Sequence, residues 1–409
     1  MNMMRLNALW VLSRLLLLSA GLLLLVGCRP ASTISTTPTP TPWPTMTPRP
    51  TPTRIQPTAT PVRDAQAFAQ AERLGRGVNL GNALEAPAEG EWGMVLEEEF
   101  FPLIRAAGFD TIRVPIRWST HAMTETPYTI DPEFFARVDW VIENGLANDL
   151  NVVINMHHYE EIFAQPDAHR ERFIALWEQI VTRYRERPDS LYFEPLNEPH
   201  DALDSARWNS LMADTVAMAR ALDTRHTLIL TGAEWGGIAG LRQMRIPGDG
   251  KNLIITFHYY DPYLFTHQGA EWSGPEVGTL GVIWPGPPKT PLEPVPEARA
   301  LAWVATWFQQ YNQASAERNP AGPAPIRASF DEVVAWAEKR GLPLWLGEFG
   351  AYSKADMQSR VNWTTFVREE AESRRIAWAY WEFGSGFGVY DREAQRWNEG
   401  LLRALIPSQ

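Results

Sequence analysis

Two glutamates stand in settings that suit acid–base and nucleophilic chemistry. Glu198 lies in Asn197-Glu198-Pro199, directly after the apolar run 191–196, and Glu348 follows the run 343–346. If the fold brings both carboxyl groups to one bound sugar, one can protonate the leaving oxygen. The other can attack the anomeric carbon or direct water onto it. The pair therefore indicates glycoside hydrolysis, although Glu198 taken singly could instead cap a helix.

Other polar and aromatic residues close or follow further apolar runs. They are Asn82 and Glu85, Arg113 and Arg117, His157 and His158, the stretch His258-Tyr259-Tyr260, and Trp381 with Glu382. One of them alone, such as His157, could be a core histidine with satisfied hydrogen bonds. Polar or aromatic groups at the ends of seven of the eight runs instead indicate one shared site.

Eight apolar runs must position these residues. They cover 77–80, 111–116, 151–156, 191–196, 226–231, 253–257, 343–346 and 376–380. Each has four to six residues and is too continuous for a sheet with one face in water. Interleaved with helices, they predict a (β/α)8 TIM barrel, whose active-site groups gather at the C-terminal ends of the strands. The alternative is a doubly wound open sheet, but residues 77–82 lack the glycine spacing of its phosphate-binding turn.

Helix boundary signals lie between the runs. Asp131-Pro132 supplies an N-cap and a first-turn proline for a helix expected to end near Asn148. The stretch Ser329-Phe330-Asp331-Glu332 reads as a capping box, with Gly341 as the C-terminal stop.

The connection 261–342 is unusually long for a barrel. It carries Trp272 and Trp284 and the run Pro285-Gly286-Pro287-Pro288. Long connections of this kind are functional or disordered. Because two tryptophans lie near its start, we expect a wall of the site rather than a disordered insertion.

Composition narrows the classes of function. The first 63 residues carry six Arg and no acidic residue, so the remaining 346 hold 31 basic and 48 acidic side chains, a net charge of −17. Such a body is a poor match for nucleic acid, whose phosphates attract basic proteins. The single Cys excludes an intramolecular disulfide and a site built from several cysteines. Sixteen of the 18 Trp lie in the body, which suits both a large core and a groove that stacks sugar rings.

The first 63 residues are expected to serve export rather than the fold. Residues 1–28 read as a lipoprotein signal peptide, with an apolar run at 15–26 and Cys28 directly after Gly27. Residues 29–63 form a disordered Thr/Pro-rich linker, since proline fixes φ and removes the amide donor. Residues 64–409 form the single globular domain. We expect a protein anchored by lipid on the extracellular face of the cell envelope, or released as a secreted form. A simple signal peptide with an incidental Cys, or an uncleaved anchor, is the alternative.

The body resembles glycoside hydrolase family 5, and within it the bacterial endo-β-1,4-glucanases. The stretches that carry the resemblance are GVNLGNALE at 77–85, IRVPIRW at 112–118, NMHHY at 155–159, LNEP at 196–199, FHYY at 257–260, FTHQG at 265–269, LGEFG at 346–350 and YWEFG at 380–384. The Asn-Glu-Pro triplet alone is a weak signal, whereas the ordered set of eight is specific.

The resemblance implies a retaining double displacement, with Glu198 as the general acid/base and Glu348 as the nucleophile. The other implied catalytic residues are Arg113, His157, Asn197, His258 and Tyr260. The implied substrate-binding residues are Asn82, Glu85, His158, Trp235, Trp272 and Trp381. Arg113 and Tyr260 would favour the carboxylate form of the nucleophile, and Asn197 would bond the sugar 2-hydroxyl. Trp381 would be the stacking floor beneath the sugar.

No metal or organic cofactor is implied for this chemistry. The paired histidines His157 and His158 are the best metal candidate, but a site built on them would need a third ligand. The expected partner is a β-linked polysaccharide or oligosaccharide, not nucleic acid, and we expect a monomer.

The substrate stays open at this level. Cellulose or a related β-glucan is expected, while β-mannan or glucomannan, xyloglucan and mixed-linkage β-glucan would suit the same mechanism. A non-catalytic carbohydrate-binding protein is a further alternative. It would be expected to lose one carboxylate, and this chain keeps both.

Overall fold

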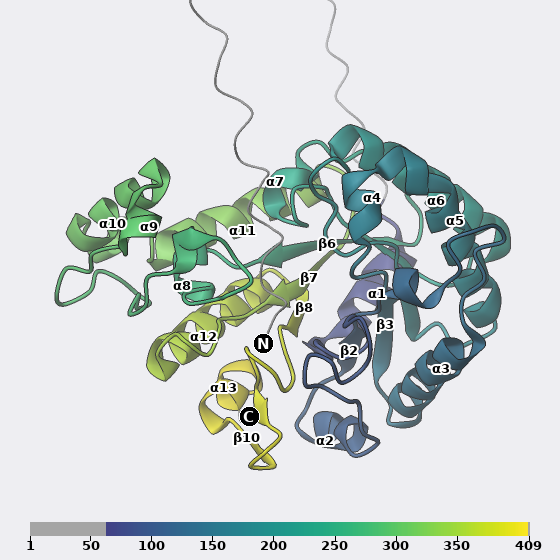
Figure 1. Cartoon of the computed structure of the whole chain (residues 1–409), viewed down its shortest axis with the longest axis horizontal. Helices are drawn as coiled ribbons and strands as arrows, with labels where there is room; N and C mark the ends of the chain where they lie inside the picture. The colour runs from purple at the N-terminus through teal and green to yellow at the C-terminus, as the bar shows by residue number, and fades with distance from the viewer. Residues whose placement is uncertain (1–62, 408–409) are drawn as a thin grey trace, which may run out of the picture. The chain divides into compact units, whose positions relative to one another are not determined.

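The computed structural model describes residues 63–407, in which eight parallel strands close into a barrel (Figure 1). The strands are β1 (Arg76–Asn79), β2 (Thr111–Val114), β3 (Asn151–Asn155), β4 (Leu191–Glu194), β5 (Leu228–Leu230), β6 (Leu253–Tyr259), β7 (Leu344–Phe349) and β8 (Ala377–Tyr380). They pair in chain order, and β8 pairs with β1. Each predicted run overlaps one strand. The (β/α)8 barrel is therefore confirmed, and the open-sheet alternative is wrong because the ring of strands has no free edge.

Helices follow the strands around the outside of the barrel. The α-helices are α1 (Ala65–Leu74), α2 (Phe100–Ala106), α3 (Pro132–Ala147), α4 (Glu160–Ala164), α5 (Pro166–Tyr184), α6 (Ser205–Leu222), α7 (Ile238–Leu241), α8 (Tyr263–Thr266), α9 (Pro296–Arg299), α10 (Ala302–Gln313), α11 (Pro323–Glu338), α12 (Met357–Ser373) and α13 (Glu399–Leu405). Shorter elements are the 3-10 turns η1 (Trp118–His121), η2 (Pro275–Val277) and η3 (Ala316–Arg318), and the hairpin of β9 (Tyr390–Asp391) and β10 (Arg396–Trp397).

One of the two predicted helix starts is confirmed and the other is wrong. α3 begins as predicted, since the Asp131 side chain accepts a hydrogen bond from the Glu133 amide at 2.9 Å. The capping box at Ser329 is wrong, because α11 begins six residues earlier, at Pro323. Proline suits the first turn of a helix, where its missing N–H would have no intrahelical partner. Gly341 lies beyond the helix end with a φ of +68°, as expected of a stop signal.

Helix α1 closes the N-terminal end of the barrel. Its Ala71 and Leu74 join an interior cluster of side chains from the strands: Val153, Tyr192, Ile229, Ile254, Trp345 and Ala379. The Tyr192 hydroxyl donates to the Gln70 side chain at 2.6 Å, which ties the helix to this interior. A larger apolar core lies between the strands and the outer helices. The opposite, C-terminal end of the barrel therefore holds the polar residues singled out above.

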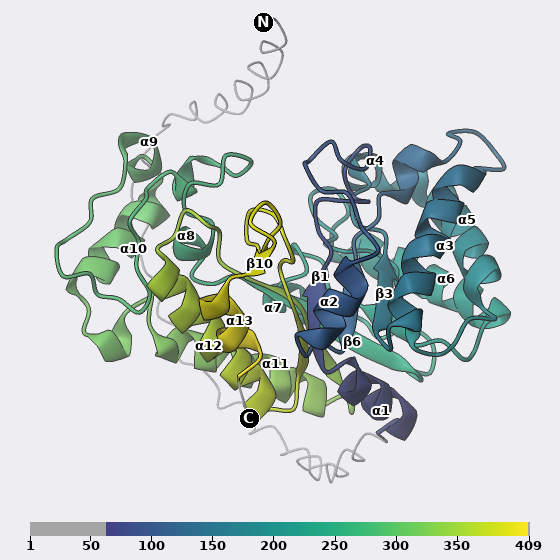
Figure 2. The ribbon, with the colours of Figure 1, turned by 90° about the horizontal axis from the view of Figure 1, so that it is seen from below.

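The connection from β6 to β7 is a folded excursion rather than a loop. It contains α8, η2, α9, α10 and η3 before the barrel helix α11, and Figure 2 shows this group beside α12. Trp284 is buried in it, with its ring 5.4 Å from that of Phe366. The expectation that Trp284 lines the site is wrong, because its indole packs into the core. Trp272 is 62% exposed.

The predicted signal peptide, 1–28, and all of the linker 29–63 except Arg63 lie outside the described residues, so these boundaries stay predictions. Within 63–407, no helix combines the length and the apolar character needed to cross a bilayer.

Candidate active site

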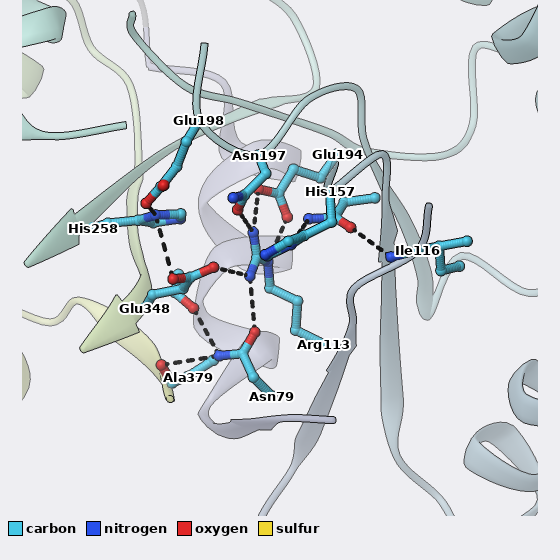
Figure 3. Close-up of polar contacts among 12 residues, drawn as sticks. Asn79, Arg113, Ile116, His157, Glu194, Asn197, Glu198, His258, Glu348 and Ala379 are labelled. Atoms are coloured by element: carbon cyan, nitrogen blue, oxygen red, sulfur yellow. Dashed lines mark hydrogen bonds and ion pairs between the residues drawn. The ribbon is translucent and has the colours of Figure 1, made fainter. Parts of the chain in front are cut away.

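The guanidinium of Arg113, in β2, is the centre of a buried polar network (Figure 3). It contacts both carboxylate oxygens of Glu194, at the end of β4, at 2.7 and 2.8 Å. Its Nη1 donates to Glu348 of β7 at 2.5 Å and to Asn79 of β1 at 2.8 Å. Its Nη2 also donates to Asn197 at 2.6 Å. An unpaired charge in a protein interior is very costly, so this set of acceptors fixes the arginine and orients every group around it.

Glu348 is held in its ionised form. Its second carboxylate oxygen accepts a hydrogen bond from the Tyr260 hydroxyl at 2.8 Å. Burial alone would raise the pKa of Glu348, but the charges of His258 and Arg113 and the Tyr260 hydrogen bond outweigh burial and lower it. An ionised carboxylate is the form that a nucleophile requires.

Glu198 is shifted in the opposite direction. It follows β4, and its Oε1 lies 2.6 Å from Nδ1 of His258. Burial raises the pKa of Glu198, and the negative charge of Glu348 adds to the rise, although His258 acts against both. Glu198 therefore keeps its proton to a higher pH than an ordinary glutamate, which suits a general acid.

Glu198, His258 and Glu348 form one compact cluster, in which one side-chain atom of each lies within 4.8 Å of the others. This closeness is compatible with the roughly 5–5.5 Å between carboxyl groups that act by double displacement. The same atoms have the types that ligate metal ions. Each is already engaged by the protein, because Arg113 and Tyr260 contact Glu348 and His258 contacts Glu198. The His157-His158 pair is not part of this cluster.

His157 and Trp381 form a stacked pair at the mouth of the barrel. Their ring centroids lie 5.4 Å apart with 11° between the planes. The Asn155 Oδ1 accepts from the Ile116 amide at 3.2 Å, so its Nδ2 donates to Nδ1 of His157, also at 3.2 Å. Burial, aided by neighbouring basic groups, lowers the pKa of His157 well below 6.5. The neutral ring therefore carries its proton on Nε2, as a donor.

Asn197 is oriented in a similar way. Because its Oδ1 accepts from Arg113, its Nδ2 is the group that remains to donate to a ligand. This matches the expected contact with a sugar hydroxyl.

The loop after β1 supplies a second wall. Glu85 is buried, and its carboxylate accepts hydrogen bonds from the backbone amides of Asn82 and of Ala83, the latter at 2.9 Å. Burial raises the pKa of Glu85 to about 8. Glu85 therefore positions Asn82, whose φ is +64°. Nearby, His158 lies edge-on to the exposed Trp92, with centroids 5.7 Å apart.

Trp235 and Trp272 supply large exposed aromatic surfaces. Trp235 is 56% exposed and stacks on His200, with centroids 3.6 Å apart and 10° between the planes. Trp272 lies edge-on to Tyr352, with centroids 4.8 Å apart. Residues 234–236 all have positive φ, and a Cβ on Gly236 would lie 3.3 Å from Glu198 Cγ. This turn therefore brings Trp235 close to the carboxyl pair.

Sequence reasoning gave no role to five residues that the structure places in or beside the site: Asn79, Asn155, Glu194, His200 and His267. Asn79, Asn155 and Glu194 close buried strands, and a polar residue in such a run was the available signal. His267 does not close a predicted strand, so its position gave no such signal. Its ring lies 4.9 Å from that of Tyr260, and burial lowers its pKa to about 4.

Comparison with known proteins gives consistent results. A family model for cellulase (glycosyl hydrolase family 5) matches residues 75–386. Endoglucanase H of Acetivibrio thermocellus is 31% identical over 356 residues, which cover 86% of this chain and 34% of that protein. Endoglucanase 3 of Fibrobacter succinogenes is 27% identical, over 81% of this chain and 52% of that protein. The chain thus spans about a third to a half of the length of these relatives.

Solved structures match over nearly their full length. Thermotoga maritima Cel5A in complex with mannotriose is 45% identical with a TM-score of 0.73, over 83% of this chain and 99% of that chain. The same protein has been solved with cellobiose. The clostridial cellulose synthase subunit Z of Clostridioides difficile is 34% identical with a TM-score of 0.71, over 81% of this chain and 99% of that chain.

Proposed function

The chain belongs to the cellulase family, glycosyl hydrolase family 5, and on that premise we propose that it is an endo-acting hydrolase of β-1,4-linked glucans. The reaction is a double displacement that retains the anomeric configuration. The proposal rests on the carboxyl pair Glu198 and Glu348, which share His258 and whose pKa values are shifted in opposite directions.

In the first step, a Glu348 oxygen attacks the anomeric carbon while Glu198 gives its proton to the departing glycosidic oxygen. The C–O bond to the leaving sugar breaks, and an ester bond forms between the glycan and Glu348. Arg113 and Tyr260, which contact the two oxygens of Glu348, keep that carboxylate ionised and aimed before the attack. Glu198 is now a carboxylate.

In the second step, Glu198 takes a proton from a water molecule, whose oxygen attacks the same carbon and releases Glu348. Two inversions give net retention. The Asn197 amide donates to the sugar 2-hydroxyl, a hydrogen bond that strengthens as positive charge develops on the ring. His157 and His258 order the site around this sugar, and Trp381 stacks beneath it.

Further sugars lie along the walls of the cleft. Asn82, Glu85 and His158 serve the non-reducing side, with the buried Glu85 acting by positioning the Asn82 turn. Trp235 and Trp272 provide faces on which additional rings stack. An open row of such contacts suits cleavage within a polymer.

The anomer released first tests the mechanism. We expect proton NMR to show the β-anomer at the start of hydrolysis, before mutarotation mixes the two forms. Transglycosylation at high acceptor concentration should accompany it, because the covalent intermediate can be intercepted by another sugar. An initial α-anomer would remove Glu348 as the nucleophile while leaving the hydrolase class intact.

β-Mannan or glucomannan is the second candidate substrate, because the Thermotoga maritima relative has been solved with mannotriose as well as cellobiose. The axial 2-hydroxyl of mannose would meet the Asn197 amide in a different geometry. Initial rates measured side by side on carboxymethyl cellulose, barley β-glucan and glucomannan decide between the substrates. A glucomannan rate well above both glucan rates would assign the enzyme to mannan.

We also propose that the protein is a lipoprotein on the outer face of the cell envelope. The support is the sequence alone, in which the only cysteine, Cys28, directly follows an apolar run and a glycine. Residues 29–63 would then act as a spacer between the lipid and the barrel.

A further inference from the structure

Helix α10 carries an exposed face that the catalytic site does not use. The face, here called the α10 platform, consists of Trp303, Thr306, Trp307 and Gln310. These positions are spaced i, i+3, i+4 and i+7, so they lie along one side of the helix. Trp303 is 52% exposed, and Trp307 is half-buried. Two partly exposed indoles side by side form an apolar patch, and such patches mark interaction surfaces.

The platform is held rigidly. On the adjoining face of α10, Val304, Phe308 and Tyr311 are buried. The Tyr311 hydroxyl accepts a hydrogen bond from the Ile283 amide at 2.8 Å. Trp307 stacks on Tyr311, with centroids 4.9 Å apart and 18° between the planes. The flat indole of Trp307 is therefore fixed in orientation.

The chemistry of α10 points to a neutral ligand with many hydroxyl groups. None of its twelve residues is charged, although the body of the protein is strongly acidic. A nucleic acid or an anionic membrane would need basic side chains around the aromatic ones. The exposed polar groups are instead the amides of Gln309 and Gln310, which can both donate and accept, and the hydroxyl of Thr306. This hydroxyl donates to the Ala302 carbonyl at 2.9 Å, so it can only accept from a ligand.

The platform is joined to the cleft through a short chain of packed elements. Trp272 is followed at once by η2, and η2 packs against α9, which directly precedes α10. The Val295 amide, just before α9, donates to the Thr279 hydroxyl at 3.0 Å. Figure 2 shows α9 at the end of the barrel that also holds α4, whereas α1 lies at the other end. The catalytic mouth and the helix that carries the platform are thus parts of one continuous structure.

We propose that the α10 platform is an accessory binding surface for a β-linked glycan chain outside the catalytic cleft. The proposal rests on the glycanase function above, because a polymer long enough to be cut internally also reaches beyond the cleft. A β-linked pyranose with equatorial hydroxyls presents C–H groups on both faces, which pack on an indole, while its hydroxyls meet the amides at the edge. Trp303 and Trp307 are separated by about 6 Å along the helix, so they offer one continuous strip.

Binding to insoluble cellulose tests the platform. In a Glu348→Ala background, which prevents turnover, we expect Trp303→Ala to weaken the binding constant by about tenfold. Trp303→Tyr should weaken the binding constant less than Trp303→Ala does, since tyrosine keeps an aromatic ring. Trp336→Ala is the matched control, because it removes a half-buried indole from α11, which the platform does not include. The control should bind like the parent, and melting curves should show that each variant is folded.

Activity separates this proposal from the proposed function. With Glu348 restored, Trp303→Ala should lower the rate on insoluble cellulose, while kcat/KM on a short soluble oligosaccharide changes by less than about twofold. Equal binding of parent and Trp303→Ala would overturn the platform. A dimer in sedimentation that disappears in Trp303→Ala would also overturn it, by assigning the face to self-association. A wild-type enzyme that cleaves no β-glycan would instead refute the proposed function, and the binding comparison would still decide the platform.

Discussion

At the scale of single residues, Arg113 shows how much the site depends on one side chain. Its guanidinium contacts Glu194, Asn79, Glu348 and Asn197, which come from three different strands and the segment after β4. Lysine would keep the positive charge but not the planar fork that satisfies several acceptors at once. The two buried carboxylates would then be left incompletely paired.

Arg113→Lys should therefore lower the free energy of unfolding by about 3 kcal/mol and reduce kcat/KM at least about a hundredfold. Urea denaturation and initial rates measure the two effects. Arg403→Lys is the control, since Arg403 pairs with Glu399 on the surface of α13 and such a pair contributes at most about 1 kcal/mol. Equal losses in the two variants would contradict a central role for Arg113.

The two glutamates can be told apart by chemical rescue. Glu348→Ala should abolish turnover, and azide should restore it on an activated glycoside with an α-azide product. Glu198→Ala should keep a fast first step when the leaving group is good, because little proton donation is then needed, and azide should yield a β-azide. Product analysis by NMR reads the result. Finding the two products exchanged would exchange the assigned roles.

At the scale of elements, the turn 234–236 requires a glycine at its third position. Gly236 has a φ of +63°, and a Cβ there would press on Glu198 and on His258 Nδ1, each at 3.3 Å. Gly248 has nearly the same φ, +60°, but nothing lies within 4 Å of the position of its Cβ. An alanine would strain the backbone at either position. Only at Gly236 would its Cβ also press on neighbouring side chains.

Gly236→Ala and Gly248→Ala should both destabilise the protein by about 1 kcal/mol, because a side chain is strained at positive φ. Only Gly236→Ala should also reduce kcat, by displacing the acid and its histidine. Thermal melting and initial rates check both statements. A similar loss of kcat in Gly248→Ala would show that the effect comes from strain alone.

Two loops at the mouth depend on buried carboxyl groups. Burial raises the pKa of Glu85 to about 8, and burial raises that of Glu382 to about 7, from ordinary values of 4.5. Glu382 accepts hydrogen bonds from the backbone amides of Ser385 and Phe387 at 2.8 and 3.2 Å. The folded protein binds these protons more tightly than the unfolded chain. Their contribution to stability is therefore complete below about pH 4.5 and is lost as the pH rises through 7 and 8.

Between pH 5 and 8, Glu382→Gln should therefore lose less melting temperature than the wild type. The histidines whose pKa values are lowered by burial act in the opposite direction but equally in both proteins. A neutral amide cannot titrate. The part of the free energy of unfolding that depends on pH should therefore be smaller by about 1–3 kcal/mol in this variant. Glu186→Gln is the control, because the Glu186 side chain is 86% exposed. Parallel slopes in Glu382→Gln and in the wild type would refute a titrating Glu382.

Elements differ in how far the sequence predicts them. The eight strands and α3 could be predicted because local signals, an apolar run or an N-cap before proline, agree with the fold. The start of α11 could not, because a second, equally plausible signal lies inside the helix. The proposed catalytic glutamates, Glu198 and Glu348, could be singled out because they follow strands. The contact between Arg113 and Glu194 could not be predicted, because hydrogen bonds between distant strands have no signature in spacing.

At the scale of the whole molecule, the proposed lipid anchor at Cys28 makes a prediction about export. Cys28→Ala should prevent incorporation of labelled fatty acid and shift the protein from the membrane fraction to the soluble fraction or to an uncleaved precursor. Ser32→Ala, which changes a neighbouring residue of similar size, should behave like the wild type. Fatty-acid labelling followed by cell fractionation measures the effect in both variants. A wild-type chain that never takes up the label would show that the protein is not a lipoprotein.

Helix α1 also determines how the enzyme faces its surroundings. The chain enters the described structure at Arg63, and α1 seals the end of the barrel opposite the carboxyl pair, with Arg73 reaching Asn151 at the start of β3. Anything attached through the N-terminus is therefore joined to the barrel at the end opposite the carboxyl pair. The proposed lipid tether would then join the chain away from the carboxyl pair, so that the linkage itself would not obstruct a polymer entering the mouth.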